Sequence, residues 1–187
     1  MSAVFWHMES MGGFMLLSLP LWLFVRTLWL MAKQQSPRWG RELLLALFGL
    51  YLIGLASQTL MGVSWRPEGM GLLEYAQSRW QQGWGINLEP GFTIRSMLEK
   101  GSYGQKMINL AGNVLIFAPL GFLAPLLWRK LRHWWAALGL SVILSCLIEF
   151  LQLFLGRSVD GDDGILNALG GLVGYILFCL LPKKWKG

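Results

Sequence analysis

Five stretches of the chain are apolar over about 20 residues each, and this feature restricts the fold more than any other. A helix rises about 1.5 Å per residue, so about 20 apolar residues cross the roughly 30 Å hydrocarbon core of a bilayer. The sequence therefore predicts an all-α, polytopic membrane helix bundle with about five transmembrane helices. The predicted spans cover residues 12–32, 43–63, 108–127, 134–155 and 164–181.

The composition excludes other classes. Hydrophobic residues make up 55% of the 187 residues and charged residues 14%, whereas soluble domains carry about 25% charged residues. A soluble enzyme and a disordered chain are both excluded, and a lipid bilayer is the expected surrounding.

The basic residues predict an orientation. They concentrate in alternate connections between the spans, and such connections face the cytoplasm. The N-terminus is then outside and the C-terminus cytoplasmic. We expect no nucleic-acid partner, because the charges form no single face and no nucleic-acid motif accompanies them. The basic connections contain Lys33, Arg38, Arg41, Arg129, Lys130, Arg132, Lys183, Lys184 and Lys186.

The long connection over residues 64–107 is predicted to be outside. Apolar residues recur in it at helical spacing, which indicates a short amphipathic helix that either lies on the outer leaflet or covers the bundle. Ser96 and Glu99 have the spacing of a capping box for a second short helix. The apolar pattern consists of Leu73, Ala76, Trp80 and Trp84.

Polar residues interrupt the last three spans on single helix faces. Because neighbouring spans run in opposite directions, these residues share a depth near the outer leaflet, below the tight loop that joins the last two spans. They are Asn109, Asn113, Glu149, Gln152 and Asn167, with Arg157, Ser158, Asp160, Asp162 and Asp163 in or beside the loop. Glu149 lies about 9 Å of helix below the end of its span, where an ionisable group is a candidate functional or catalytic residue. The alternative is that the cluster only holds helices together through hydrogen bonds.

The acids of the loop have two interpretations. Asp160, Asp162 and Asp163 offer hard oxygen ligands for a divalent cation, and no other cofactor is predicted. Alternatively, Asp162 or Asp163 caps the last helix, whose N-terminus favours an acid. Gly170, Gly171 and Gly174 indicate close helix contact in the last span.

The polar positions resemble those of VanZ-like membrane proteins. The stretch 109–122, NLAGNVLIFAPLGF, is similar to the family's third-helix signature, and Asn87-Leu-Glu-Pro90 is similar to an element that precedes it. In the family this element commonly continues directly to Phe, whereas here Gly91 intervenes. The second half of the match comprises Ser145, Glu149, Gln152, Arg157, Asp160, Asp163, Asn167, Gly170 or Gly171, and Gly174.

The resemblance implies a multi-pass protein of the cell (cytoplasmic) membrane in the bacterial envelope, from a family named for low-level teicoplanin resistance. Residues 1–42 form an N-terminal transmembrane helix and basic loop, 43–181 the VanZ-like membrane domain with its outer loop 64–107, and 182–187 a basic tail. The implied ligand-binding site comprises Asn109, Asn113, Glu149, Gln152, Arg157, Asp160, Asp163 and Asn167.

Three functions remain open from the sequence. The first is binding of a lipid or lipid-linked cell-wall precursor head group, with Arg157 on a phosphate or carboxylate and the acids on amines or hydroxyls. The second is a hydrolase or transferase on such a head group, with Glu149 as general acid or base. The third is a structural or assembly protein whose polar cluster binds no ligand.

Overall fold

The computed structural model describes residues 3–60, 67–100 and 103–182. Five of its helices are long and apolar enough to cross a membrane, which confirms the predicted all-α membrane bundle. They are α1 (Ala3–Ala32), α2 (Trp39–Leu60), α5 (Tyr103–Leu127), α6 (Trp134–Leu155) and α7 (Gly161–Leu180). Four helices begin earlier than the predicted spans: α1 nine residues before residue 12, α2 four before residue 43, α5 five before residue 108 and α7 three before residue 164.

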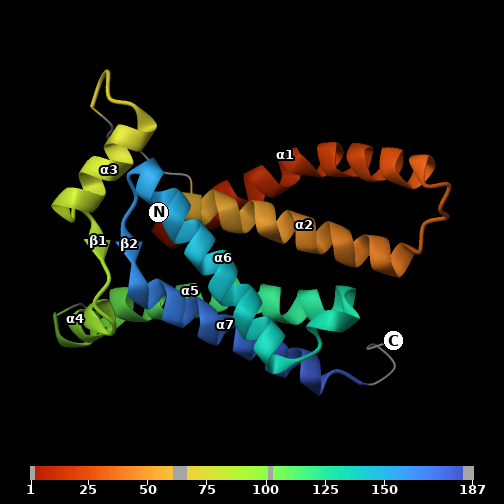
Figure 1. Ribbon diagram of the computed structural model, residues 1–187. Helices are drawn as coiled ribbons and strands as arrows, with labels where there is room; N and C mark the ends of the chain where they lie inside the picture. Colours follow the sequence, from red (N-terminus) through yellow and green to blue (C-terminus); the bar gives the residue numbers. More distant parts are fainter. Residues whose placement is uncertain (1–2, 61–66, 101–102, 183–187) are drawn as a thin grey trace.

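Glycines bring α7 into close contact with α5 and α6. A Cβ atom added at Gly174 would lie 1.9 Å from the carbonyl oxygen of Ala118, and one added at Gly171 would lie 1.9 Å from the hydroxyl of Ser141. Both distances are far below van der Waals contact. The glycine pattern thus has the packing role that the sequence indicated, and it sets the three helices side by side (Figure 1).

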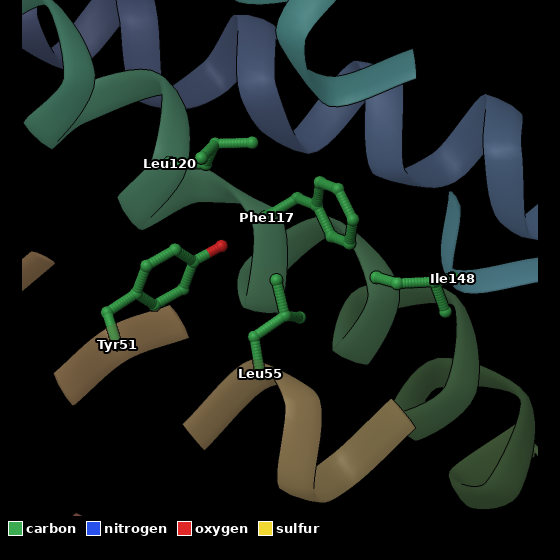
Figure 2. Close-up of a cluster of buried hydrophobic side chains, with 5 residues drawn as sticks. All are labelled: Tyr51, Leu55, Phe117, Leu120 and Ile148. Carbon is green, nitrogen blue, oxygen red and sulfur yellow. The ribbon is translucent and has the colours of Figure 1, made fainter. Parts of the chain in front are cut away.

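The apolar core joins α2 to α5 and α6. Figure 2 shows Tyr51 and Leu55 of α2 beside Phe117 and Leu120 of α5 and Ile148 of α6, all of them buried. The Tyr51 hydroxyl also donates a hydrogen bond of 2.9 Å to the carbonyl oxygen of Ile116. These contacts attach α2 firmly to the three-helix unit.

Helix α1 packs along α2 as an antiparallel hairpin (Figure 1). The guanidinium of Arg26 donates hydrogen bonds of 2.5 and 2.8 Å to the two carboxylate oxygens of Glu42. This ion pair connects the C-terminal part of α1 with the first turn of α2.

Short elements cover one end of the bundle, which we call the polar end. They are α3 (Leu72–Gln82), β1 (Ile86–Asn87), α4 (Phe92–Lys100) and β2 (Val159–Asp160). The two strands pair in parallel, with Ile86 opposite Val159. The α1–α2 connection and the 3₁₀ turn η1 (Arg129–Leu131) lie at the opposite end, which we call the basic end (Figure 1).

Helix α3 confirms the predicted short helix, but much of its apolar pattern faces away from the protein. Leu73 and Trp80 are 77% and 58% exposed, whereas Ala76 and Arg79 are buried against α6. The helix therefore covers the bundle with one face and leaves an apolar face outward.

The predicted capping box is wrong. Helix α4 already begins at Phe92, so Ser96 lies inside it and is not the residue that precedes its first turn. The start of α4 is stabilised by a residue far away in the sequence, because the carboxylate of Asp162 accepts hydrogen bonds from backbone N–H groups at this end of the helix.

Candidate functional site

The C-terminus of α6 is capped by a buried arginine from α3. The Arg79 guanidinium donates hydrogen bonds of 3.0 Å to the carbonyl oxygen of Gln152, 2.8 Å to that of Leu153 and 2.6 Å to that of Arg157. Arg79 is only 4% exposed. These bonds add to the backbone cap, in which the N–H groups of Gly156 and Arg157 already donate to the Gln152 carbonyl oxygen, and they fix the loop that follows. Sequence reasoning missed this residue, although its position three residues after Ala76 places it on the same helix face.

Asp162 caps the N-terminus of α4. Its side chain is fully buried, and its two carboxylate oxygens accept hydrogen bonds from the backbone N–H groups of Gly91 (2.5 Å) and Ile94 (3.0 Å). A carboxylate at this position also complements the positive end of the helix dipole. Thus one of the three candidate cation ligands holds the short helix that covers the site.

Asp160 caps α7 and organises the strand pair. One of its carboxylate oxygens accepts the backbone N–H of Asp162 at 3.0 Å and the side-chain amide of Asn87 at 3.4 Å. The other accepts the Thr93 hydroxyl at 2.5 Å. An acid of the loop does cap α7, as predicted, but the capping residue is Asp160 and not Asp162 or Asp163.

Glu149 connects α6 with this loop. Its carboxylate accepts the backbone N–H of Asp160 at 2.9 Å, so this candidate residue has a hydrogen-bond partner at its depth in the membrane. The bond links the last two turns of α6 with Asp160, the residue that caps α7.

Three amide side chains join neighbouring helices. Asn113 of α5 donates a hydrogen bond of 2.5 Å to the carboxylate of Asp163 on α7. Asn167 of α7 donates one of 2.8 Å to the hydroxyl of Ser145 on α6, and Gln152 of α6 donates one of 2.8 Å to the carbonyl oxygen of Thr59 on α2. These three bonds connect four helices in pairs, and we call the set the polar network.

Two cavities adjoin this network and share Asn113 and Asp163. The first, which we call the polar cavity, has a volume of about 280 Å³. Its polar lining comprises Gln58, Thr59, Asn113, Glu149, Gln152, Arg157, Asp163 and Asn167. The second has a volume of about 250 Å³, and Thr93, Ser158 and Asp160 contribute to its polar lining.

The structure thus brings together almost all of the predicted site. Every predicted ligand-binding residue except Asn109 lines one of the two cavities, and the side chain of Asn109 lies outside the described part of the structure. The contributions of Gln58, Thr59, Asn87 and Thr93 were missed. Asn87 had a signal, since it opens the Asn-Leu-Glu-Pro element of the sequence.

Two of the amides that line the polar cavity are incompletely bonded. Among the described residues, the buried side-chain oxygens of Gln152 and Asn167 accept no hydrogen bond. A buried polar atom without a partner costs about 1–3 kcal/mol. Such atoms are uncommon in folded proteins, and a partner that the polypeptide does not supply is one explanation for them.

The candidate cation ligands are directed to different partners. Asp160 and Asp162 accept hydrogen bonds from Thr93 and from the α4 backbone, and Asp163 accepts one from Asn113. Within residues 3–60, 67–100 and 103–182, no three His, Cys, Asp or Glu side chains lie close enough together to hold a metal ion. Cation binding at this loop stays a prediction.

The five apolar helices, with a charged and amide-lined cavity toward one end, define a multi-pass membrane protein. The model of the VanZ/LLP1 family matches residues 43–182. The chain belongs to this family, and the matched region begins in the second turn of α2 and ends just after α7. No curated protein and no solved structure gives a significant match.

Proposed function

We propose that this protein binds the head group of a lipid or a lipid-linked cell-wall precursor in the polar cavity. The observation that carries the proposal is the cavity itself, which is lined by Glu149, Asp163, Arg157 and several amides between helices that are otherwise apolar. Polar groups at membrane depth are costly, and those that line a cavity typically mark a ligand or ion pathway.

The lining suits a ligand that carries both an anionic group and hydrogen-bond donors. The guanidinium of Arg157 matches the geometry of a phosphate or carboxylate. The carboxylates of Glu149 and Asp163 accept hydrogen bonds from amines or hydroxyls, and the amides orient the head group. A phosphorylated sugar or amino-alcohol head group has this combination.

A role in helix packing alone accounts less well for the cluster. Packing requires that buried polar atoms be paired, yet the side-chain oxygens of Gln152 and Asn167 accept no hydrogen bond from the described residues. A ligand that donates hydrogen bonds would supply partners after small rotations of these side chains. This consideration favours the binding role.

The proposal includes a location. Basic residues concentrate at the end opposite the cavity, and such residues face the cytoplasm. The polar end then lies at the outer leaflet of the bacterial cytoplasmic membrane, where lipid-linked cell-wall precursors are used. Binding such a precursor would also provide a physical basis for a link to teicoplanin resistance, after which VanZ-like proteins are named.

The test is native mass spectrometry of the protein extracted in mild detergent. Wild type is compared with Glu149→Gln and Arg157→Ala for co-purifying lipids and for binding of an added polyprenyl phosphate. Two exposed residues of the polar end provide matched controls, Glu74→Gln and Arg95→Ala. We expect wild type and controls to retain the same ligand and both site variants to lose it.

The same four variants separate ligand binding from folding. Circular dichroism melts show whether each variant still forms the bundle. Retention of the ligand by Glu149→Gln and Arg157→Ala would contradict the proposal, and loss of thermal stability without a ligand-specific defect would favour the packing role. For resistance, a teicoplanin-susceptible bacterium expressing wild type should tolerate more antibiotic than one expressing Arg157→Ala.

A further inference from the structure

The basic end contains a further pocket, far along the bundle from the two cavities of the polar end. It lies between the start of α2 and the end of α5 and has a volume of about 600 Å³. Four arginines from three segments line it: Arg38 and Arg41 from the start of α2, Arg129 from η1, and Arg132 from the turn before α6. No carboxylate is among the described residues that line this basic pocket.

The acid that follows Arg41 in the chain is engaged mainly by an arginine outside the basic pocket, and Arg41 attracts it only weakly. Glu42 follows Arg41 in the chain, but its two carboxylate oxygens accept hydrogen bonds from Arg26 on α1. The N-terminus of α2 adds the positive end of a helix dipole beside Arg38 and Arg41. Arginines at a helix N-terminus repel this dipole, so an anion in the pocket would relieve the repulsion.

The pocket also has an apolar part. Leu44, Leu126 and Leu127 line it toward the membrane-spanning part of α2 and α5, and Trp39, which is 80% exposed, also lines it. Tryptophan favours the interface between lipid and water. An arginine rim above leucines matches an amphiphile that has an anionic head and an acyl chain.

We propose that the basic pocket binds the phosphate head group of an anionic phospholipid. Planar guanidinium groups bind phosphate oxygens in pairs, and basic pockets between transmembrane helices bind lipid phosphates at the cytoplasmic side. This site is independent of the polar cavity. The leucines favour a phospholipid over a free phosphate, because a free phosphate gains nothing from apolar contacts.

The test compares phosphatidylglycerol and phosphatidylcholine of identical acyl chains, titrated onto the detergent-solubilised full chain in native mass spectrometry. For wild type we expect phosphatidylglycerol to bind at least about fivefold more tightly, since each basic residue near a lipid head group adds a measurable preference. The double variant Arg38→Gln/Arg129→Gln should lose this preference. Arg132 is left unchanged because its guanidinium donates a hydrogen bond to the carbonyl oxygen of Pro125.

The matched control removes the same charge from the same end. Lys33 and Lys130 are exposed and do not line the pocket, so Lys33→Gln/Lys130→Gln should keep the preference. Leu126→Trp should abolish it without any change of charge, because the indole fills the apolar part. Melting curves identify a variant that does not fold, and Leu126→Trp and the arginine variant test the site separately.

Three results would overturn the inference. An unchanged preference in the arginine variant would exclude the pocket. An equal loss in the lysine control would mean that diffuse charge, not a pocket, attracts the lipid. Displacement of phosphatidylglycerol by glycerol 3-phosphate at equal concentration would mean that the pocket recognises a free phosphate.

Discussion

The side-chain amide of Asn113 on α5 donates a hydrogen bond of 2.5 Å to the carboxylate of Asp163 on α7, although 50 residues separate them. The two residues also line both cavities of the polar end. Close packing of α5 against α7 at the glycines brings them together, so helix packing and site geometry depend on the same contact.

This pair should be energetically coupled. In a double-mutant cycle of Asn113→Ala and Asp163→Ala, measured by thermal or denaturant unfolding in detergent, we expect a coupling free energy of about 1–2 kcal/mol, as for strong hydrogen bonds between membrane helices. Strictly additive effects would mean that the contact contributes nothing to the stability of the bundle.

Arg79→Gln should be strongly destabilising. The substitution removes a buried guanidinium that satisfies three carbonyl oxygens at the end of α6. We expect a loss of about 2–4 kcal/mol in the free energy of unfolding, because three buried hydrogen bonds from a charged donor are lost. Arg95→Gln, an exposed arginine on α4, is the control and should have little effect in the same unfolding measurement.

Gly174→Ala should destabilise the contact between α5 and α7. The new methyl group would lie 1.9 Å from the carbonyl oxygen of Ala118, so the helices must separate, at a cost of about 1–3 kcal/mol. Gly139→Ala on α6 is the matched control, because a Cβ there meets no atom within 4 Å. A melting temperature of Gly174→Ala equal to that of the control would contradict the close packing.

Asp162→Asn should loosen α4. The change replaces one of two carboxylate oxygens that accept the Gly91 and Ile94 backbone N–H groups, and it removes the negative charge at the helix N-terminus. We expect faster amide hydrogen exchange in α4, measured by mass spectrometry, with little change in α5 or α6. Glu89→Gln removes an exposed charge nearby and should leave the exchange of α4 as it is in wild type.

The orientation can be tested by cysteine labelling in intact cells. In a background with Cys146 and Cys179 replaced by Ala, Glu89→Cys at the polar end should react with a membrane-impermeant maleimide. Lys130→Cys at the basic end should react only after the cells are opened, because the excess of basic residues predicts that this end faces the cytoplasm. The reverse pattern would place the polar cavity on the cytoplasmic side.

Local features of the sequence determined the membrane spans and the members of the site. Apolar length sets the number of spans, and the depth of Glu149, Gln152 and Asn167 follows from counting residues along a helix. Opposite helix directions then place these groups at one end. Helix direction and depth were therefore enough to assign the polar residues to one site before their contacts were known.

The sequence alone did not determine which polar groups pair. The caps that Arg79 and Asp162 provide join residues 68 to 78 positions apart, and such contacts depend on how α3 and α4 fold back over the bundle. The predicted capping box at Ser96 was wrong for this reason, because the carboxylate of Asp162 stabilises an earlier start of α4. Periodicity and span length are properties of one segment, whereas a hydrogen bond between segments depends on the packing of the whole chain.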